Sequence, residues 1–278
     1  MQIPDIRDIE AAARRISGFA VRTPLLSSDV LDALVGGRVL VKAECLQRTG
    51  SFKFRGAFNR ISQLNAEQNP GGVVAYSSGN HAQGVAAAAR IAQLPCLIVM
   101  PSVTPDIKRI NTLSHGAEIV LYDREKESRE AIAAHYAAKR QAVLVPPYED
   151  IDVIAGQGTI GLEMAADAAA AGLEMDQMLV CCSGGGLAAG IAISLSSVSS
   201  RTNVHTVEPQ GFDDMARSLR AGKRVRNQAM TGSVCDALLS PEPGEIAFAA
   251  GQTLFKEGLV VVDGEALAAV KSLDIAVA

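Results

Sequence analysis

Short aliphatic runs alternate with longer alanine-rich or amphipathic stretches along most of this chain, and this alternation limits the fold more than any other feature. Apolar runs of four or five residues bounded by turn residues predict strands, and stretches of 10 or more residues with helical periodicity predict helices. The predicted strands are 38–42, 72–76, 96–100, 118–121, 142–145, 178–182 and 203–207, and the predicted helices are 51–64, 82–94, 105–114, 125–140, 158–171 and 187–197. Strands and helices that alternate in this way predict parallel sheets covered by helices on both faces. The expected fold class is therefore α/β and doubly wound.

The domain organisation follows from length and from the lack of linkers. The 278 residues are enough for roughly two domains of about 150 residues each. No internal repeat and no disordered linker separates two halves of the sequence, so a second domain must be interleaved with the first. We expect residues 72–150 to form a small domain, residues 1–71 and 151–278 together to form a large domain, and the active site to lie in the cleft between them.

Composition excludes several classes of partner. With 26 Lys and Arg against 30 Asp and Glu, 4% aromatic residues and no Trp, the chain lacks the basic, aromatic surface of a nucleic-acid-binding protein. Five cysteines without a C-x-x-C pair indicate a reducing compartment, and the first ten residues lack the pattern of a signal peptide, so a cytoplasmic protein is expected. The uncharged stretch 177–200 contains three consecutive glycines and several serines, which predict a strand, a loop and a helix rather than a membrane span.

Lys53 has the sequence setting of a reactive amine. A Gly-Ser pair opens the predicted helix just before it, and Phe52 and Phe54 flank it. The positive end of a helix and apolar neighbours both disfavour the ammonium form, and a nucleophilic lysine needs the free amine. The alternative is a surface lysine whose methylene groups cover apolar neighbours.

Two polar turns follow predicted strands and open predicted helices. Residues 77–84 (SSGNHAQG) place main-chain N–H groups and short polar side chains where a carboxylate could bind. The alternative there is ordinary helix capping with a structural histidine. Residues 183–186 (SGGG) can converge several N–H groups on one oxyanion, as in a phosphate site, and the alternative is a tight turn that merely requires glycine. No Lys follows, so this is not a Walker loop.

Two further motifs carry weaker signals. Residues 156–161 match G-x-G-x-x-G and Asp176 lies about 20 residues beyond, but the preceding segment is short and acidic, so a dehydrogenase is a minor alternative. The turn 208–214 carries carboxylates that could bind Mg²⁺ or Ca²⁺, although acidic residues in loops are usually only solvated.

In combination these motifs resemble the pyridoxal-phosphate enzymes of the tryptophan-synthase β fold, fold type II, and within it the serine/threonine dehydratase and serine racemase family. The similarity runs in the family's order through residues 23–25, 42–44, 51–57, 77–81, 153–159, 183–187 and 208–209. It implies two interleaved doubly wound α/β domains and the cofactor pyridoxal 5'-phosphate.

The resemblance also implies a role for each matching residue. The catalytic residues would be Lys53, which would hold the cofactor as a Schiff base, and Ser78, the acid/base on the opposite face. The cofactor-binding residues would be Lys53, Phe52, Asn80, Ser183, Gly184, Gly185, Gly186 and Leu187. The substrate carboxylate would bind at Ser77, Gly79, Asn80 and His81. A divalent cation, Mg²⁺ or Ca²⁺, would bind at Glu208, the Phe212 carbonyl and Asp214.

The implied reaction is the dehydration and deamination of a small hydroxy amino acid, L-threonine or L-serine, to a 2-oxo acid and ammonia. Several threonine deaminases of the family carry Ala where this chain has Ser78, so the serine favours the metal-dependent branch that also racemises serine. Serine racemase is therefore one alternative, and a non-catalytic truncated relative is another. The expected partner is a small amino acid, with no nucleic acid and no membrane, and the expected assembly is a homodimer.

The carboxyl end departs from the family pattern. After residues 260–263 the family has a helix, a Glu-Pro-Gly/Ala-Gly turn and a final strand that closes on Ser-Gly-Gly-Asn, whose serine contacts the pyridine nitrogen. The chain stops at Ala278 without them, and it has Asp236-Ala237 where many relatives have Asp-Gly. A chain truncated in this way is expected to fold less stably and to hold its cofactor less well.

Overall fold

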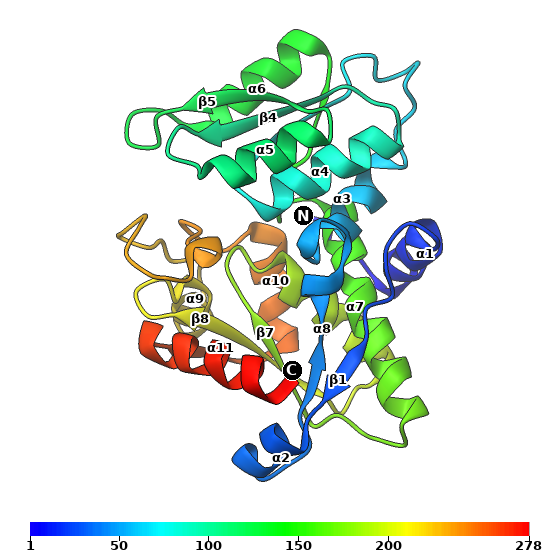
Figure 1. The fold of residues 1–278 in the computed structure, drawn as a ribbon, viewed down its shortest axis with the longest axis vertical. Helices are drawn as coiled ribbons and strands as arrows, with labels where there is room; N and C mark the ends of the chain where they lie inside the picture. The colour runs from blue at the N-terminus through cyan, green and yellow to red at the C-terminus, as the bar shows by residue number, and fades with distance from the viewer. Residues whose placement is uncertain (278) are drawn as a thin grey trace.

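The computed structural model describes residues 1–277 and contains two parallel sheets and one antiparallel strand pair (Figure 1). The strands are β1 (Leu25–Ser27), β2 (Leu40–Lys42), β3 (Val73–Tyr76), β4 (Cys96–Pro101), β5 (Glu118–Tyr122), β6 (Val143–Leu144), β7 (Gln177–Cys181), β8 (Asn203–Pro209) and β9 (Phe255–Val261). The α-helices are α1 (Ile6–Ile16), α2 (Asp29–Val35), α3 (Lys53–Ile61), α4 (Asn80–Ile91), α5 (Asp106–Ser114), α6 (Arg129–Arg140), α7 (Ile151–Ala170), α8 (Gly186–Val198), α9 (Asp214–Ala221), α10 (Glu245–Leu254) and α11 (Asp263–Val277). Short 3₁₀ turns are η1 (Glu44–Leu46), η2 (Arg48–Gly50) and η3 (Asp236–Leu238).

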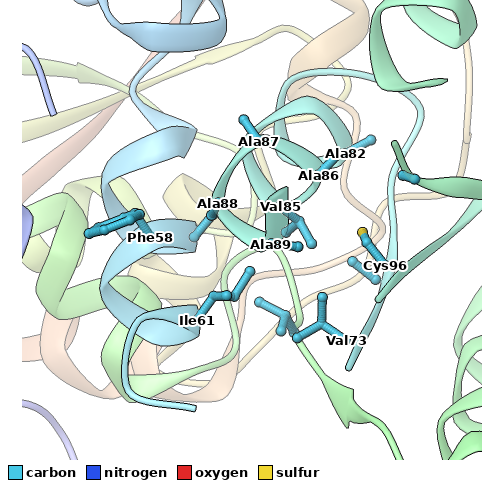
Figure 2. Packing of buried hydrophobic residues seen from close by; sticks show 14 of the residues in the cluster. Phe58, Ile61, Val73, Ala82, Val85, Ala86, Ala87, Ala88, Ala89 and Cys96 are labelled. Atoms are coloured by element: carbon cyan, nitrogen blue, oxygen red, sulfur yellow. The ribbon is translucent and has the colours of Figure 1, made fainter. Parts of the chain in front are cut away.

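The first parallel sheet has four strands in the order β5-β4-β3-β6. All six residues of β4 are buried, as expected for a strand that lies between neighbours and under helices. Helix α4 covers this sheet with a run of small side chains, and Figure 2 shows Phe58 and Ile61 of α3 on one side of that run and Val73 and Cys96 of the sheet on the other. The alanines keep α4 thin enough for two layers to pack closely against it.

The second parallel sheet has three strands in the order β7-β8-β9. We expected helices to bury both faces of this sheet, but the residues of β7 alternate between exposed and buried. Leu179, on the outer side of β7, is 61% exposed. Within residues 1–277, one face of the sheet is therefore left uncovered at its β7 edge.

Helix α7 begins earlier than the sequence indicated. The predicted helix was 158–171, whereas α7 starts at Ile151, where the Asp150 carboxylate accepts a hydrogen bond from Val153 N at 2.9 Å. The G-x-G-x-x-G motif thus lies inside a helix. A Cβ at Gly156 would lie 2.6 Å from the Cα of Gly56 in α3, and a Cβ at Gly158 would lie 2.7 Å from the carbonyl oxygen of Gly190 in α8. These glycines let three helices cross in backbone contact, and the nucleotide interpretation of the motif is wrong.

The α/β class with parallel sheets is confirmed. The strands of the four-stranded sheet all lie within residues 73–144, and those of the three-stranded sheet lie within residues 177–261. No described helix has both the length and the apolar character needed to cross a membrane. Residues Asp263–Val277 form α11, at the place where the family has a helix after residues 260–263.

Candidate active site

Three strands end where the predicted site residues lie. Strands β3, β6 and β7 lead into residues 77–79, 145–149 and 183–185 respectively. In parallel α/β sheets, ligands bind at the carboxyl ends of the strands, so these three segments define the candidate site.

Lys53 is the first residue of α3 and is half-buried. Its Nζ donates a hydrogen bond to the carbonyl oxygen of Pro147 at 2.7 Å and lies 5.1 Å from the centre of the Phe52 ring. Desolvation of the ammonium group lowers the pKa of Lys53 to about 8. About a tenth of this amine is unprotonated at pH 7, compared with less than about a thousandth of a solvated surface lysine.

The start of α3 is fixed by a buried arginine two residues beyond Lys53. The Arg55 side chain is 0% exposed and donates hydrogen bonds to Glu44 at 2.8 and 2.9 Å and to Glu163 at 2.7 and 2.9 Å. Two bidentate carboxylate partners hold a guanidinium in one orientation. This network sets the position from which Lys53 extends.

The turn before α4 presents free main-chain donors. Gly79 is the N-cap of α4, and no side chain among the described residues caps this helix end, so the N–H groups of its first turn have no acceptor within the helix. Ser77 Oγ accepts a hydrogen bond from Gly79 N at 3.2 Å, Ser77 and Ser78 are half-buried, and Asn80 is exposed. The helix dipole adds to these donors, so an anion is favoured here.

The His81 side chain is buried and already hydrogen-bonded within the protein. Its ring is 2% exposed, and Nε2 donates to the carbonyl oxygen of Val145 at 2.9 Å. Burial and the nearby Lys53 ammonium group lower the pKa of His81 to about 3, so the ring is neutral. Only the main-chain N–H and Nδ1 remain for a ligand, and Nδ1 is buried without a partner in the described structure.

The glycine loop requires glycine at positions 184 and 185 and leaves little room for a side chain at 186. Gly185 has φ +86° and is the N-cap of α8, again without a capping side chain. A Cβ at Gly184 would collide with the Tyr148 ring, and a Cβ at Gly186 would lie 3.1 Å from the main chain of Tyr148. Ser183 Oγ lies 2.6 Å from Ser240 Oγ. The loop therefore presents the N–H groups of a helix start, as an oxyanion site needs.

Residues 145–149, here called the junction segment, join these parts, and sequence reasoning missed them. Val145 O binds His81, Pro147 O binds Lys53, and the Tyr148 ring covers the glycine loop. The Glu149 carboxylate accepts hydrogen bonds from the first two N–H groups of α10. Lys53 and the glycine loop therefore contact adjacent residues of one segment. Its position after a predicted strand was the available signal, but its residues are neither Gly-rich nor Ser-rich.

A cavity of about 570 Å³ lies beside the junction segment, between Tyr76 at the end of β3 and Tyr148. Its wall is highly charged, with four arginines and five glutamates, and Lys53 does not line it. The charged residues are Arg124, Arg129, Arg224, Arg226, Glu127, Glu130, Glu149, Glu242 and Glu245. Residues 183–186 do not line it either, so the cavity meets the candidate site through Tyr148 and Glu149 of the junction segment.

Two buried carboxylates flank the turn between β8 and α9, Glu208 near the end of the strand and Asp214 at the first residue of the helix. Both oxygens of Glu208 accept hydrogen bonds from the start of α9, from Met215 N at 2.9 Å and Ala216 N at 2.8 Å. Asp214 Oδ1 accepts from Asn227 Nδ2 at 2.6 Å, and Asp214 Oδ2 is buried without a partner among the described residues. Burial raises the pKa of Glu208 to about 8 and that of Asp214 to about 7.

Few groups near Glu208 and Asp214 could act as ligands to a cation. Phe212 lies in the turn between the two carboxylates, and its N–H donates to Pro209 O at 2.9 Å. In the described part of the chain, no three His, Cys, Asp or Glu side chains gather closely enough to form a metal site by themselves. The predicted set of Glu208, the Phe212 carbonyl and Asp214 therefore contains only two carboxylates.

Comparison with known proteins identifies the family. The family model described as "Pyridoxal-phosphate dependent enzyme" matches residues 16–275. The chain belongs to this family. The family assigned by resemblance from the sequence motifs is therefore confirmed.

Relatives within the family cover most of the chain. An L-threo-3-hydroxyaspartate ammonia-lyase from Pseudomonas sp. is 44% identical over 81% of this chain and 69% of its own length. A threonine deaminase from T.th. superposes with a TM-score of 0.93 at 40% identity, covering 99% of this chain and 87% of the other. A maize serine racemase also superposes with a TM-score of 0.93, at 35% identity, covering 99% and 84%.

The side chains of this pyridoxal-phosphate family member fit its cofactor. The cofactor needs a lysine amine and an anion site for its phosphate, and the chain offers Lys53 with a lowered pKa and an uncapped glycine loop at a helix start. Two buried polar atoms near Lys53 in sequence or in space, Ser51 Oγ and His81 Nδ1, have no partner in the described structure. Unpartnered polar atoms in such a position are expected where a polar ligand binds.

Proposed function

We propose that this chain is a pyridoxal-phosphate-dependent ammonia-lyase that converts a small β-hydroxy amino acid, L-serine or L-threonine, into a 2-oxo acid and ammonia. The proposal rests chiefly on Lys53, whose amine has a pKa of about 8 and shares the junction segment with the glycine loop. The names of the relatives, which include threonine deaminase and hydroxyaspartate ammonia-lyase, support the same reaction class.

The cofactor would be held by residues at the starts of three helices, α3, α4 and α8. Lys53 would bind it covalently, the main-chain N–H groups of residues 183–187 would bind its phosphate, Asn80 would bond its ring hydroxyl, and Phe52 would border it. When bound, pyridoxal phosphate supplies the electron sink that stabilises negative charge at the substrate Cα.

The chain's own residues would bind the substrate and move its protons. Residues 77–81 would bind the carboxylate, and the free Lys53 Nζ would remove the Cα proton. Ser78, on the opposite side, would be the second acid/base. The β-hydroxyl leaves with a proton as water, and one water molecule is then consumed when the nitrogen leaves as ammonia, so the products are one 2-oxo acid and one ammonia.

Serine racemisation is the second candidate reaction. It needs a proton donor on the face of Cα opposite Lys53, and the Ser78 hydroxyl, half-buried in the turn at the end of β3, is the group that would supply it. The similarity to maize serine racemase supports this reaction.

We also propose a divalent cation, Mg²⁺ or Ca²⁺, at Glu208, the Phe212 carbonyl and Asp214. Burial raises the pKa of both carboxyl groups, and an adjacent cation would offset the cost of their buried negative charge. The unpartnered Asp214 Oδ2 is available as a ligand. The role of the cation would be structural.

The proposed assembly is a homodimer. Helix α5 exposes three aliphatic side chains at a spacing of three residues, Ile107, Ile110 and Leu113, with exposures of 62, 58 and 51%. An apolar stripe of this kind on a helix pairs readily with its own copy across a two-fold axis.

One set of measurements tests the leading function. Protein loaded with pyridoxal phosphate should show the visible absorption band of a lysine-bound cofactor, and Lys53→Ala should abolish it and lower turnover by at least about 10²-fold. Lys256→Ala, which removes an exposed lysine, should change neither.

Assaying 2-oxo acid and D-serine from the same L-serine incubation separates elimination from racemisation. Folded wild-type protein that shows no band and forms neither product would be a binding protein rather than an enzyme, and this result would refute the proposal.

A further inference from the structure

Lys108 lies along the turn that precedes α4. Its side chain extends from the third residue of α5 toward Gly79, where an added Cβ would lie 3.6 Å from Lys108 Cδ and 3.8 Å from both Cε and Nζ. The end of the lysine therefore lies beside this glycine, about one side-chain atom away from its backbone. A basic side chain thus borders the N-cap of α4.

The ammonium group has an exposed partner from the other half of the molecule. Lys108 Nζ lies 2.9 Å from Asp236 Oδ2, and Asp236 is the first residue of η3. Among the described residues, this is the ion pair that links the part containing the four-stranded sheet, 72–150, to the part beyond residue 177. The Asp236 side chain is 72% exposed and that of Lys108 is 31% exposed. Such a pair contributes little to stability, so its partners can exchange at low cost.

The turn itself lacks a full positive charge. Its donors are the N–H groups of the first turn of α4 and the hydroxyl groups of Ser77 and Ser78, and His81 is neutral because burial and Lys53 lower its pKa. A carboxylate binds more strongly to donors that include a charged group. Lys108, whose side chain borders Gly79, is placed to supply this charge.

We propose that Lys108 is a substrate-binding residue whose ammonium group pairs with the substrate carboxylate at residues 77–80, and that Asp236 occupies that position until the substrate displaces it. The proposal rests on the proposed function, because the turn is taken as the carboxylate site. It predicts that the chain recognises the charge of the carboxylate, and that Asp236 competes with the substrate for Lys108.

The experiment uses 3-hydroxypropanoate, which has the carboxylate and β-hydroxyl group of serine but no amino group to react with the cofactor. Its Kd is measured on the cofactor-loaded protein for the wild type, Lys108→Met, Asp236→Asn and Arg109→Met. Arg109 is the matched control, because it is the next residue of α5, carries the same charge and pairs with Asp106 of its own helix. A second probe, 3-hydroxypropanamide, has the same shape without the charge.

We expect Lys108→Met to weaken carboxylate binding by about tenfold or more and Asp236→Asn to strengthen it by about threefold, while Arg109→Met stays within twofold of the wild type. Amide binding should respond to none of these changes. Lys108→Gln gives the same comparison if the methionine variant does not fold. The inference is wrong if Lys108→Met binds the carboxylate as Arg109→Met does, or if the wild type does not bind it.

Turnover of L-serine and L-threonine is measured separately on the same samples. A protein that binds 3-hydroxypropanoate through Lys108 but consumes neither amino acid would contradict the proposed function and leave the carboxylate site standing. If the wild type turns over an amino acid but Lys108→Met changes neither Kd nor KM, the role of Lys108 is refuted and the proposed function stands.

Discussion

At the scale of single residues, the site depends on two basic groups that share a buried region. Desolvation lowers the pKa of Lys53 to about 8, and burial together with the Lys53 ammonium group lowers that of His81 to about 3. Each binds a carbonyl oxygen of the junction segment, Pro147 for Lys53 and Val145 for His81. The result is one amine close to its deprotonation point and one imidazole that stays neutral at any physiological pH.

The lowered pKa of Lys53 predicts a pH dependence that can be measured without substrate or cofactor. Because only the free amine reacts, labelling of Lys53 by a small amine-reactive reagent should rise with pH to a midpoint near 8. Peptide mass spectrometry measures the extent at each pH. In protein unfolded by urea, the midpoint should return to about 10.5, the value of an ordinary lysine.

The lowered pKa of Lys53 also makes stability depend on pH. Between pH 8 and 10.5 the unfolded chain holds the Lys53 proton more tightly than the folded chain does. The cost of burying this ammonium group therefore disappears as the pH rises through that range, and the free energy of unfolding increases. A labelling midpoint in folded protein that equals the midpoint in urea would contradict the burial argument.

At the scale of secondary-structure elements, two helices begin on glutamate carboxylates from elsewhere in the chain. Glu208 accepts hydrogen bonds from the first N–H groups of α9, and Glu149 accepts hydrogen bonds from those of α10. Both residues satisfy donors that a helix start leaves unpaired. They differ in surroundings, because Glu208 lies beside the buried Asp214, whereas Glu149 lines the cavity next to the junction segment.

This similarity provides a controlled test of the proposed cation. Adding Mg²⁺ to chelator-treated wild-type protein should raise the Tm, since a ligand that binds only the folded chain stabilises it by mass action, by about 2.7 kcal/mol at 100 times Kd. Glu208→Gln should remove the response, whereas Glu149→Gln, which alters a capping carboxylate of the same kind, should retain it. Calorimetry with and without chelator measures the effect, and a wild-type Tm that is indifferent to Mg²⁺ and Ca²⁺ would exclude the cation.

Most elements of the fold were predictable because their signals are local. Apolar runs and helical periodicity indicated β3, β4, α5 and β8 to within one or two residues. The first turns of α7 were missed, since glycines at 156 and 158 are poor helix formers and only their contacts with Gly56 and Gly190 make them favourable. Tertiary packing decides such positions, and no local pattern records it.

The parts of the site that have local sequence signals were also predictable. The turns at 77–81 and 183–186 carry Gly, Ser and Asn directly after strands, and they lie at strand ends as expected. The junction segment and the pairing of Lys108 with Asp236 were missed, because they depend on partners 94 and 128 residues apart in sequence. Nothing in the spacing of those residues indicates their contact.

At the scale of the whole molecule, the surface of the four-stranded sheet region carries the apolar stripe of α5. The protein should run at twice its chain mass of 29.0 kDa in size-exclusion chromatography with light scattering. Ile110→Glu, at the centre of the stripe, should produce monomers because it places a charge on the buried face of the proposed dimer. Val198→Glu, at an exposed aliphatic position at the end of α8, should leave the mass unchanged. A monomeric wild type, or a dimer that survives Ile110→Glu, would contradict this arrangement.

The close crossing of α3 and α7 has a consequence for how such a chain can be rearranged. Gly56 and Gly156 bring these helices into backbone contact, although the entire four-stranded sheet, residues 73–144, lies between them in sequence. The chain thus leaves the neighbourhood of α3 and returns to it after building a separate sheet. A segment with both ends anchored at one place can be exchanged as a cassette, and we expect recombinants that swap residues 72–150 between relatives to fold more often than those that cross over inside either sheet.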